Sequence, residues 1–423
     1  MVMPVLAILA LNYPGYSALM LGLAIGGYGL TQALLQIPMG VLSDKIGRKP
    51  VIIGGLLVFA MGSGVAAMAD SMVWLVIGRF LQGAGAIAGA IMALAGDVSR
   101  ESQRSKVMAI IGVAIGFSFY LALLIGPLIA DNFGLRGIFA ITGILALLCI
   151  PMLIWFVPNA SNVAPKGDTL PVLADVRTLF FDPQLRRLNI SVLILHLLIT
   201  LLFVQIPTLL INFGWELNNH WQLYLPVLLG SIISMAGLMI LAKKTNQQTV
   251  IKLSILILIT VFAGMYLNHS LPGLLVLSWL FFSAFNFLEA NFPALVSSIA
   301  PAGKKGSAMG IYASFQFFGA FLGGVLSGGI SEYLGSQWVF LVAATICLLW
   351  LMILGGLRGT EGLKRYTLSA NLHGQSVEQI GQRLSDIKGI RDITIVPDED
   401  TVYLKVDSKQ FKLQEAKLAL KLE

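Results

Sequence analysis

Two fully charged side chains stand deep within long apolar runs of the chain. They are Glu289, in the run FNFLEANFPALV, and Arg79, in the run LVIGRFLQG. A charge at membrane depth is costly, so such residues usually handle ions, protons or substrates. A carboxyl group removed from water takes up a proton more readily and releases it when water returns. Glu289 is therefore a candidate proton carrier, with Asn286 and Asn291 near it on the helix; a structural carboxyl group bonded to a neighbouring helix is the alternative.

Arg79 and His196 are the next candidates for proton handling. Arg79 stays protonated at physiological pH, so it could either hold a proton carrier by electrostatic attraction or complete a buried ion pair. His196 lies in LILHLLIT and is the only histidine deep within an apolar run. Imidazole has an ordinary pKa of about 6.5, which suits proton exchange, and a hydrogen-bonded structural role is equally open.

The composition of the chain places these residues in a membrane. Of its 423 residues 57% are hydrophobic and 12% are charged, whereas roughly 25% of an average soluble domain is charged. A helix needs about 20 apolar residues to cross the hydrocarbon. The first of the predicted spans is too short for that, and we expect its start upstream of Met1. The twelve spans are 1–12, 18–42, 51–69, 72–96, 107–130, 136–157, 188–212, 221–242, 250–268, 272–299, 307–330 and 337–357.

Lysine and arginine are distributed unequally between the two sides of the predicted bundle. The loops after spans 2, 4, 6, 8 and 10 are rich in both, whereas the loops on the other side hold only Arg136. Positively charged loops remain in the cytoplasm, so these loops and the C-terminus are expected there. The net charge of +7 is therefore explained by topology and gives no sign of nucleic-acid binding.

The spans divide into two similar halves. Residues 158–187 carry four prolines and mixed charge, and they predict a cytoplasmic linker between 1–157 and 188–357. A shift of 201 positions aligns DNFGLRGIF (131–139) with EYLGSQWVF (332–340). The predicted fold class is thus an all-α polytopic membrane protein with two pseudo-symmetric six-helix bundles, the first span being truncated. Parallel repeats of this kind place a substrate site between them, near the membrane midplane.

Residues 358–423 have the composition of a soluble domain. Strand patterns at RYTLSANL, IRDITIVP and TVYLKVD alternate with helical patterns at SVEQIGQRLSDI and KLQEAKLALKL. The order β-α-β-β-α predicts a small α+β domain of the ferredoxin-like type without its last strand. Regulation, docking against the cytoplasmic face of the bundle, or self-association are its expected roles.

Uncharged polar side chains within the spans are candidates for lining a substrate cavity. The aromatic residues Phe281, Phe285, Phe317 and Phe318 could form an apolar wall for hydrophobic cargo, although helix packing is the favoured explanation for most of them. The candidate cavity residues are Tyr28, Gln32, Gln36, Gln205, Asn286, Tyr312 and Gln316.

The connection GVLSDKIGRKP between spans 2 and 3 holds one acid, three bases and two glycines in eleven residues. Gly40 and Gly47 would allow close helix packing and a tight turn. Asp44 can pair with Arg48 or cap the next helix, and Lys49 follows directly. A charged cluster of this kind could hold one conformation and release another. An ordinary positively charged loop is the alternative.

Three motifs resemble those of the major facilitator superfamily. The order G-x-L-x-D-x-x-G-R-K resembles its signature loop, and LVIGRFLQGAGAIAGA (75–90) resembles its span-4 motif. The stretch GVAIGFSFYLALLIGPLIAD (112–131) is similar to the span-5 motif of its proton-coupled exporters, although Ala130-Asp131 stands where that motif usually has two glycines. The residues of this motif are Gly112, Gly116, Gly126 and Pro127. The tail is similar to the domain appended to bacterial transporters of the YajR type.

The resemblance implies roles for particular residues. Asp44 and Arg48 would form a charge network with Asp97 that acts as a conformational latch and stabilises the outward-open state by holding the two halves together. Arg79 would assist proton transfer. It implies a multi-pass protein of the bacterial inner membrane that is driven by the proton gradient and needs no other cofactor.

The function expected from all these features is proton-coupled efflux of small amphipathic compounds by alternating access. The partners are then the lipid bilayer, protons and a small-molecule substrate. A proton-independent facilitator or importer, or a membrane sensor that signals through the tail, remain the alternatives. An enzyme is not expected, because no nucleophile–base pair is visible. A metal site is not expected either, because Cys149 and Cys347 stand singly in apolar runs.

Overall fold

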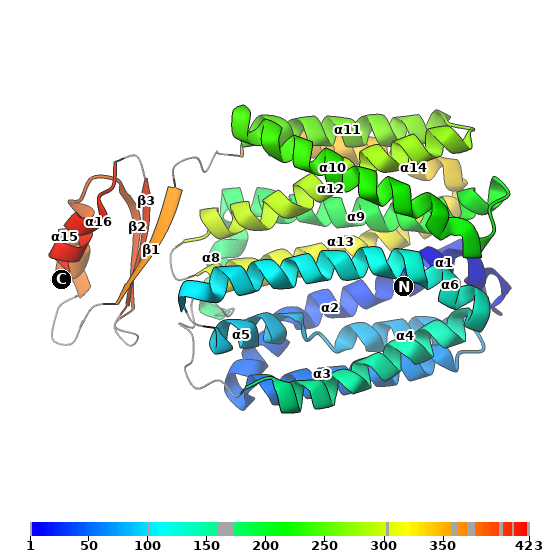
Figure 1. Cartoon of the computed structure of the whole chain (residues 1–423), viewed down its shortest axis with the longest axis horizontal. Helices are drawn as coiled ribbons and strands as arrows, with labels where there is room; N and C mark the ends of the chain where they lie inside the picture. The colour runs from blue at the N-terminus through cyan, green and yellow to red at the C-terminus, as the bar shows by residue number, and fades with distance from the viewer. Residues whose placement is uncertain are drawn as a thin grey trace.

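Long helices run side by side through most of the computed structural model, and a small domain stands beyond one end of the bundle (Figure 1). We call the end of the bundle nearer this domain the tail-facing end and the opposite end the far end. The residues that the structure describes are 2–99, 101–158, 173–301, 304–357, 363–369, 377–396, 401–407 and 410–420.

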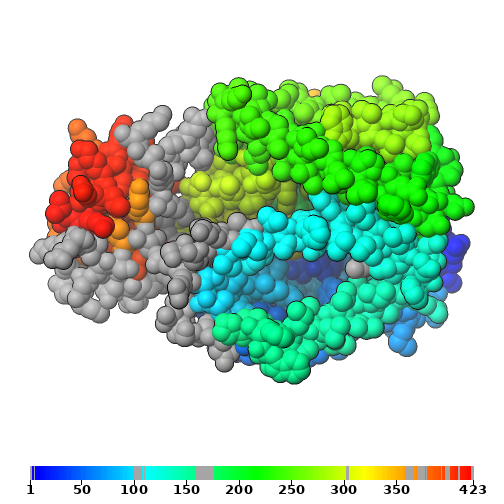
Figure 2. All heavy atoms as spheres, in the orientation of Figure 1, coloured from blue at the N-terminus to red at the C-terminus, as the bar shows by residue number. Residues whose placement is uncertain are grey.

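The first set of helices covers the N-terminal half. It comprises α1 (Met3–Leu9), η1 (Ala10–Asn12), α2 (Ala18–Ile46), α3 (Arg48–Ala67), α4 (Met72–Ala84), α5 (Ala88–Val98) and α6 (Glu101–Phe156). The helix α6 bends at Gly134, where φ is 62°, and so joins the expected spans 5 and 6. Its two arms enclose a hollow on the face shown in Figure 2, with earlier parts of the chain at its floor.

The second set of helices covers the C-terminal half. It comprises α8 (Leu173–Phe181), α9 (Pro183–Asn212), η2 (Leu217–Asn219), α10 (His220–Lys244), α11 (Gln247–Leu267), α12 (Leu271–Ile299), α13 (Lys305–Tyr333) and α14 (Ser336–Leu354). Ten helical stretches of the described chain are long and apolar enough to cross a membrane, and one of them is the bent stretch Ile110–Phe156. The polytopic all-α fold is confirmed. The helix α8 lies within the expected linker 158–187, of which residues 159–172 are outside the described part.

Several helices begin where the sequence supplies a cap. Ser17 accepts a hydrogen bond from the backbone N–H of Met20 at the start of α2 (3.2 Å). Asp182 accepts from two backbone N–H groups at the start of α9, each at 2.9 Å, and Pro183 occupies the first helical position. These caps satisfy N–H groups that have no partner within the helix.

The expected fourth span is broken into two helices, which the uniform apolar run 72–96 did not predict. The break covers Gly85 to Ile87, and Ala86 has a φ of +39°. Two glycines at the end of α4 and the start of the break let other backbones approach closely there. A Cβ on Gly83 would lie 2.1 Å from the carbonyl oxygen of Tyr28, and one on Gly85 would lie 2.6 Å from that of Gly55.

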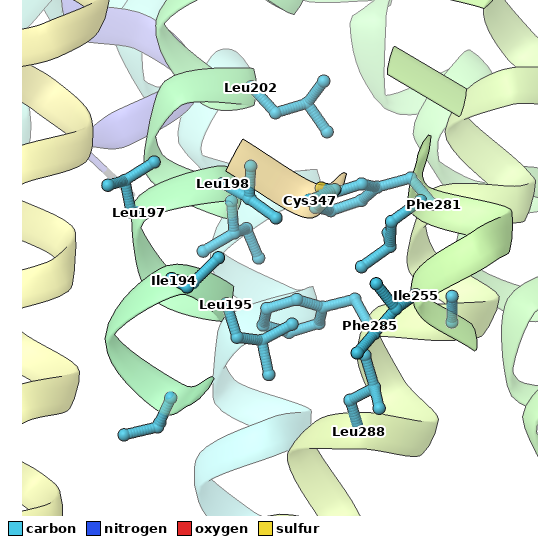
Figure 3. Close-up of a cluster of buried hydrophobic side chains, with 14 of the residues drawn as sticks. Ile194, Leu195, Leu197, Leu198, Leu202, Ile255, Phe281, Phe285, Leu288 and Cys347 are labelled. Atoms are coloured by element: carbon cyan, nitrogen blue, oxygen red, sulfur yellow. The ribbon is translucent and has the colours of Figure 1, made fainter. Parts of the chain in front are cut away.

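The C-terminal half is organised around α9, which is buried on almost every side. Leu195, Leu198 and Leu202 of α9 pack against Phe281 and Leu288 of α12, with Cys347 of α14 beside them (Figure 3). This apolar core fixes the rotation of α9 and α12 about their own axes. It therefore also fixes the direction of every polar side chain on those two helices.

The tail domain is an antiparallel sheet covered by two helices on one face. Its elements are β1 (Leu363–Ser369), α15 (Val377–Ser385), β2 (Ile390–Val396), β3 (Thr401–Asp407) and α16 (Leu413–Ala419), and the sheet order is β1-β3-β2. The order of elements is the one that the sequence predicts. The two helices lie on the side away from the bundle (Figure 1), and Lys405 donates a hydrogen bond to the carbonyl oxygen of Ile299 at the end of α12 (2.8 Å).

The two halves meet along α2 and α13, where small residues replace side chains. A Cβ on Gly22 would lie 2.2 Å from the carbonyl oxygen of Gly324, and one on Gly328 would lie 2.3 Å from that of Ala18. At the far end, Glu332 of α13 accepts hydrogen bonds from the backbone N–H groups of Ala18 (2.6 Å) and Leu19 (3.3 Å). A carboxylate at a helix N-terminus is favourable because of the helix dipole. The halves are thus joined closely at this end.

We predict that Gly22→Ala destabilises the protein by about 1–3 kcal/mol, the usual cost of overpacking a tight contact. The measurement is thermal unfolding of the purified protein in detergent. Gly54→Ala is the matched control, because a Cβ at this helical glycine meets nothing within 4 Å. Equal stability of Gly22→Ala and the wild type would show that the halves are not packed through these glycines.

Candidate functional site

Glu289, His196 and Gln316 meet inside the C-terminal half, although they come from three helices. The side-chain amide of Gln316 donates to Oε1 of Glu289 (3.3 Å) and lies 2.8 Å from Nε2 of His196. The other ring nitrogen of His196, Nδ1, is 3.2 Å from the carbonyl oxygen of Val192. Both contacts are satisfied by a neutral ring that donates from Nδ1 and accepts at Nε2. One amide thus joins an acid and a potential base.

The cluster is only partly saturated with hydrogen bonds. Oε2 of Glu289 and the hydroxyl of Tyr312 are both buried and have no hydrogen-bond partner among the described residues. Nε2 of His196 lies 3.8 Å from Oε1 of Glu289, and a third of the Glu289 side chain remains accessible. One carboxyl oxygen of Glu289 and the hydroxyl of Tyr312 thus have no hydrogen bond from the described part of the chain to offset their removal from water.

The cluster lies well inside the bundle. Glu289 is ten residues before the end of α12, and Gln316 is eleven residues after the start of α13. At 1.5 Å per residue, both are about 15 Å from the tail-facing ends of their helices. The cluster is therefore several helical turns away from that end of the bundle.

A second polar contact on α12 joins the two halves. Asn286, one helical turn from Glu289, donates to the hydroxyl of Tyr120 on α6 (2.6 Å) and to Oγ of Ser231 on α10 (3.1 Å). Tyr120 belongs to the N-terminal half and the other two residues to the C-terminal half. Glu289 therefore lies one helical turn from a hydrogen bond that joins the two halves.

Arg79 is held inside the N-terminal half without an acidic partner among the described residues. It donates to the carbonyl oxygen of Ala24 (2.9 Å) and to Oε1 of Gln82 (2.6 Å), and its guanidinium lies 5.2 Å from the ring centre of Tyr28. Gln82 donates in turn to Ser63 on α3 (2.7 Å). The charge is thus stabilised by dipoles and an aromatic face, and not by the ion pair that was one alternative.

Arg48 is the centre of the charged cluster after α2. It donates to Asp97 of α5 (2.9 Å), to Ser43 (3.0 Å) and to Asp44 (3.4 Å). The Arg48 and Asp97 side chains are 8% and 3% accessible, so their attraction is only weakly screened by water. The next residue, Lys49, donates to the carbonyl oxygen of Val157 at the end of α6 (2.7 Å). The cluster and Lys49 therefore tie α2, α3, α5 and α6 together.

The stretch GVLSDKIGRKP, expected to be a loop, is almost entirely helical, because α2 continues to Ile46 and α3 begins at Arg48. Its two glycines therefore differ: Gly40 lies within α2, and Gly47 forms the turn. Gly47 has a φ of +98°, in the region that favours glycine, and it allows α3 to start directly after α2. Gly40 accepts a hydrogen bond from Oγ of Ser43 at its carbonyl oxygen (2.7 Å), which orients Ser43 toward Arg48.

The glycines of the span-5 motif fall into two groups on α6. Gly126 and Pro127 are buried. Gly112 and Gly116 are exposed, and a Cβ at either position would meet nothing within 4 Å. Close packing therefore does not explain why the first two positions are glycine in this structure.

The candidate cavity residues do not form one group. Tyr312 and Gln316 lie in the Glu289 cluster and Tyr28 lies at Arg79. Gln32 donates to Gln36 of the same helix (3.1 Å), and both are buried. Gln205 of α9 donates to two serines of α13, Ser327 (2.8 Å) and Ser331 (3.0 Å). It therefore ties α9 to α13.

Several partners were not anticipated from the sequence. Tyr120 and Ser231 hold Asn286, Ser43 completes the Arg48 cluster, and Glu332 joins the halves. Each is a polar residue in or beside an apolar span, and this property was the only indication in the sequence that it has a polar partner. Which of the many such residues face a partner depends on how the helices are rotated.

Comparison with known proteins identifies the family. The sequence matches the Major Facilitator Superfamily over residues 1–267 and 249–370. It is 38% identical over 421 residues to the inner membrane transport protein YajR of Escherichia coli (strain K12), covering 98% of this chain and 93% of that protein. It is 25% identical to the multidrug resistance protein MdtH of Aeromonas hydrophila, covering 84% and 90%.

A solved structure shows the same fold. A bacterial homologue of the human lysosomal transporter Spinster superposes with a TM-score of 0.68 at 14% identity, covering 84% of this chain and 91% of that one. Together with the polytopic helical architecture and the buried charged residues, these matches establish that the chain is a multi-pass membrane transporter of the Major Facilitator Superfamily.

Proposed function

We propose that this transporter exports small amphipathic compounds in exchange for protons. The observation that carries the proposal is the bridge from Gln316 to Glu289 and His196 within the C-terminal half. We further propose that the protein lies in the bacterial inner membrane with its tail in the cytoplasm. The relative from E. coli is named an inner membrane protein, and the distribution of Lys and Arg favours this orientation.

Glu289 carries the proton in this account. When it is ionised, Oε1 accepts from Gln316 and Oε2 has no donor, which is an unfavourable state for a buried oxygen. Proton uptake removes the charge and converts one oxygen into a donor, for which the unpartnered hydroxyl of Tyr312 in the same cluster is a candidate acceptor. His196 is the group through which the proton enters or leaves, because its Nε2 is held 3.8 Å from Oε1.

Protonation is coupled to the movement of the halves through α12. The helix carries Glu289 and, one turn away, Asn286, which donates to Tyr120 in the other half. A small rotation or shift of α12 that follows a change of charge at Glu289 weakens or strengthens this contact. Substrate bound between the halves would bias the same equilibrium, and this coupling is what an exchanger requires.

We propose that Arg48, Asp44 and Asp97 act as a latch at the tail-facing end. The contacts of Arg48 with Ser43 and Asp44 of α2 and with Asp97 of α5 all lie within the N-terminal half, whereas the resemblance to the family implies a latch that holds the two halves together. The latch therefore acts by holding α2, α3 and α5 as one rigid body. A rigid bundle transmits motion at its interface with the other half instead of deforming.

Glu289→Gln is expected to abolish proton movement that depends on substrate. Glutamine keeps the shape and the polar contacts but does not titrate, so the exchange of charge is lost. The measurement is proton release from proteoliposomes under an imposed pH gradient when cationic dyes are added. Glu216→Gln changes an exposed carboxyl group in a far-end loop and is the control, which should behave as the wild type.

Two outcomes would contradict this role of Glu289. Substrate-dependent proton release that persists in Glu289→Gln would remove Glu289 from the proton pathway. Substrate flux in the wild type that ignores the pH gradient would instead identify a facilitator.

Asp97→Asn should weaken the latch by leaving Arg48 buried without its strongest partner. Breaking one side of a buried ion pair costs about 3–5 kcal/mol, and the lower part of this range applies because Asp44 and Ser43 remain. We expect a lower unfolding temperature together with slower transport. The exposed cation Lys243, changed to Gln, controls for the loss of a charge at the same end of the bundle. Transport at the wild-type rate in Asp97→Asn would exclude a role for the latch.

A further inference from the structure

An apolar groove lies between the last turns of α2 and the helix α8 at the tail-facing end. It has a volume of about 640 Å³. Its floor and walls include Ile37, Val41 and Leu42 of α2 and Phe180 of α8. Leu42 is 38% exposed and Phe180 is 41% exposed, so the groove is not filled by the described part of the chain.

Two cations line this apolar groove. Lys45 comes from the last turn of α2 and Arg177 from the middle of α8, and both are exposed. Neither has a hydrogen bond or an ion pair within the described residues, whereas the adjacent acid, Asp44, is bonded to Arg48. The groove therefore combines an apolar surface with two positive charges whose counter-ions are not supplied by the described protein.

We propose that this groove binds one anionic phospholipid. Its phosphate would lie between Lys45 and Arg177, and one acyl chain would lie along α2 and against Phe180. Basic pockets between transmembrane helices at a membrane surface suit anionic head groups. A soluble anion would leave the apolar floor exposed, and a neutral lipid would leave the two cations unpaired. Only a molecule with both properties satisfies the whole groove.

The position of the groove gives the lipid a structural effect. One wall is the end of α2, which carries Asp44 and is separated from Arg48 of α3 by one residue. The other wall is α8, whose Phe180 packs against Phe315 of α13 with ring centres 5.8 Å apart. The lipid thus touches the N-terminal half on one side and a helix attached to the C-terminal half on the other. Binding stabilises the arrangement in which these elements lie together.

The test uses the full-length protein in detergent and dioleoyl phosphatidylglycerol as the anionic lipid. Native mass spectrometry measures how many lipids bind and how tightly, and thermal unfolding measures stabilisation. Dioleoyl phosphatidylcholine has the same acyl chains without net negative charge. We expect one tightly bound phosphatidylglycerol per chain, a higher unfolding temperature with it, and little effect of phosphatidylcholine.

The double variant Lys45→Ala and Arg177→Ala should bind phosphatidylglycerol roughly thirtyfold more weakly, since both cations act near the same anionic head group. Lys243→Ala with Lys244→Ala removes two exposed cations from the same end of the bundle, outside the groove, and should bind as the wild type does. Unfolding temperatures without lipid show whether both variants are folded.

Three results would overturn the proposal. The first is equal binding of the two lipids, and the second is full binding by the Lys45 and Arg177 variant. The third is displacement of phosphatidylglycerol by an equal concentration of oleate, which would assign the groove to a single-chain carboxylate instead of a phospholipid. None of these measurements depends on proton coupling.

Discussion

Polar groups inside a membrane-spanning bundle must find their partners within the protein, because hydrocarbon offers none. This constraint organises the interior of the transporter. Arg79 is satisfied by backbone carbonyl oxygens, an amide and a ring, and Arg48 by two carboxylates and a hydroxyl. The Glu289 cluster departs from the pattern, because it leaves Oε2 and the hydroxyl of Tyr312 without a described partner. This departure is why we propose Glu289 as the group whose charge changes during the transport cycle.

The two halves differ from the interface between them in how they are held together. In the proposed cycle, the α9 core and the Arg48 cluster hold the helices of each half together, and relative motion is confined to the contact between the halves. That contact relies on closely packed glycines and on a few hydrogen bonds between the halves. Among these bonds are the one from the backbone N–H of Ala18 to Glu332 and the one from Asn286 to Tyr120. Close backbone packing gains van der Waals contact without long side chains that would interlock the halves. An interface of this kind can separate at one end while it remains joined at the other.

Some of this could be predicted from the sequence, because hydrophobic length and charge placement act locally. The long spans and the order of elements in the tail follow from periodicity and composition. The doubling of the helical unit follows from the alignment of 131–139 with 332–340. The fold class and the superfamily were predicted from local motifs and are confirmed. Glu289 and Arg79 could be singled out because a charge in an apolar run is conspicuous.

Other features depend on the third dimension. The break between α4 and α5 arises because the backbones at Tyr28 and Gly55 approach Gly83 and Gly85, which no local pattern records. The seven candidate cavity residues separate into several clusters, because the packing of each helix decides which way a glutamine points. Tyr120 and Glu332 each bond with a residue of the other half, so their partners are known only once the two halves are packed together.

The most direct test of the account follows the protonation of Glu289 itself. Infrared difference spectroscopy of the protein in lipid, recorded as pH is changed, detects the carbonyl stretch of protonated carboxyl groups. The account predicts one such band that titrates with pH, is lost in Glu289→Gln and decreases when a transported substrate is added. A band that is unaffected by the substitution or by substrate would contradict it, because the proton that drives transport would then be bound elsewhere.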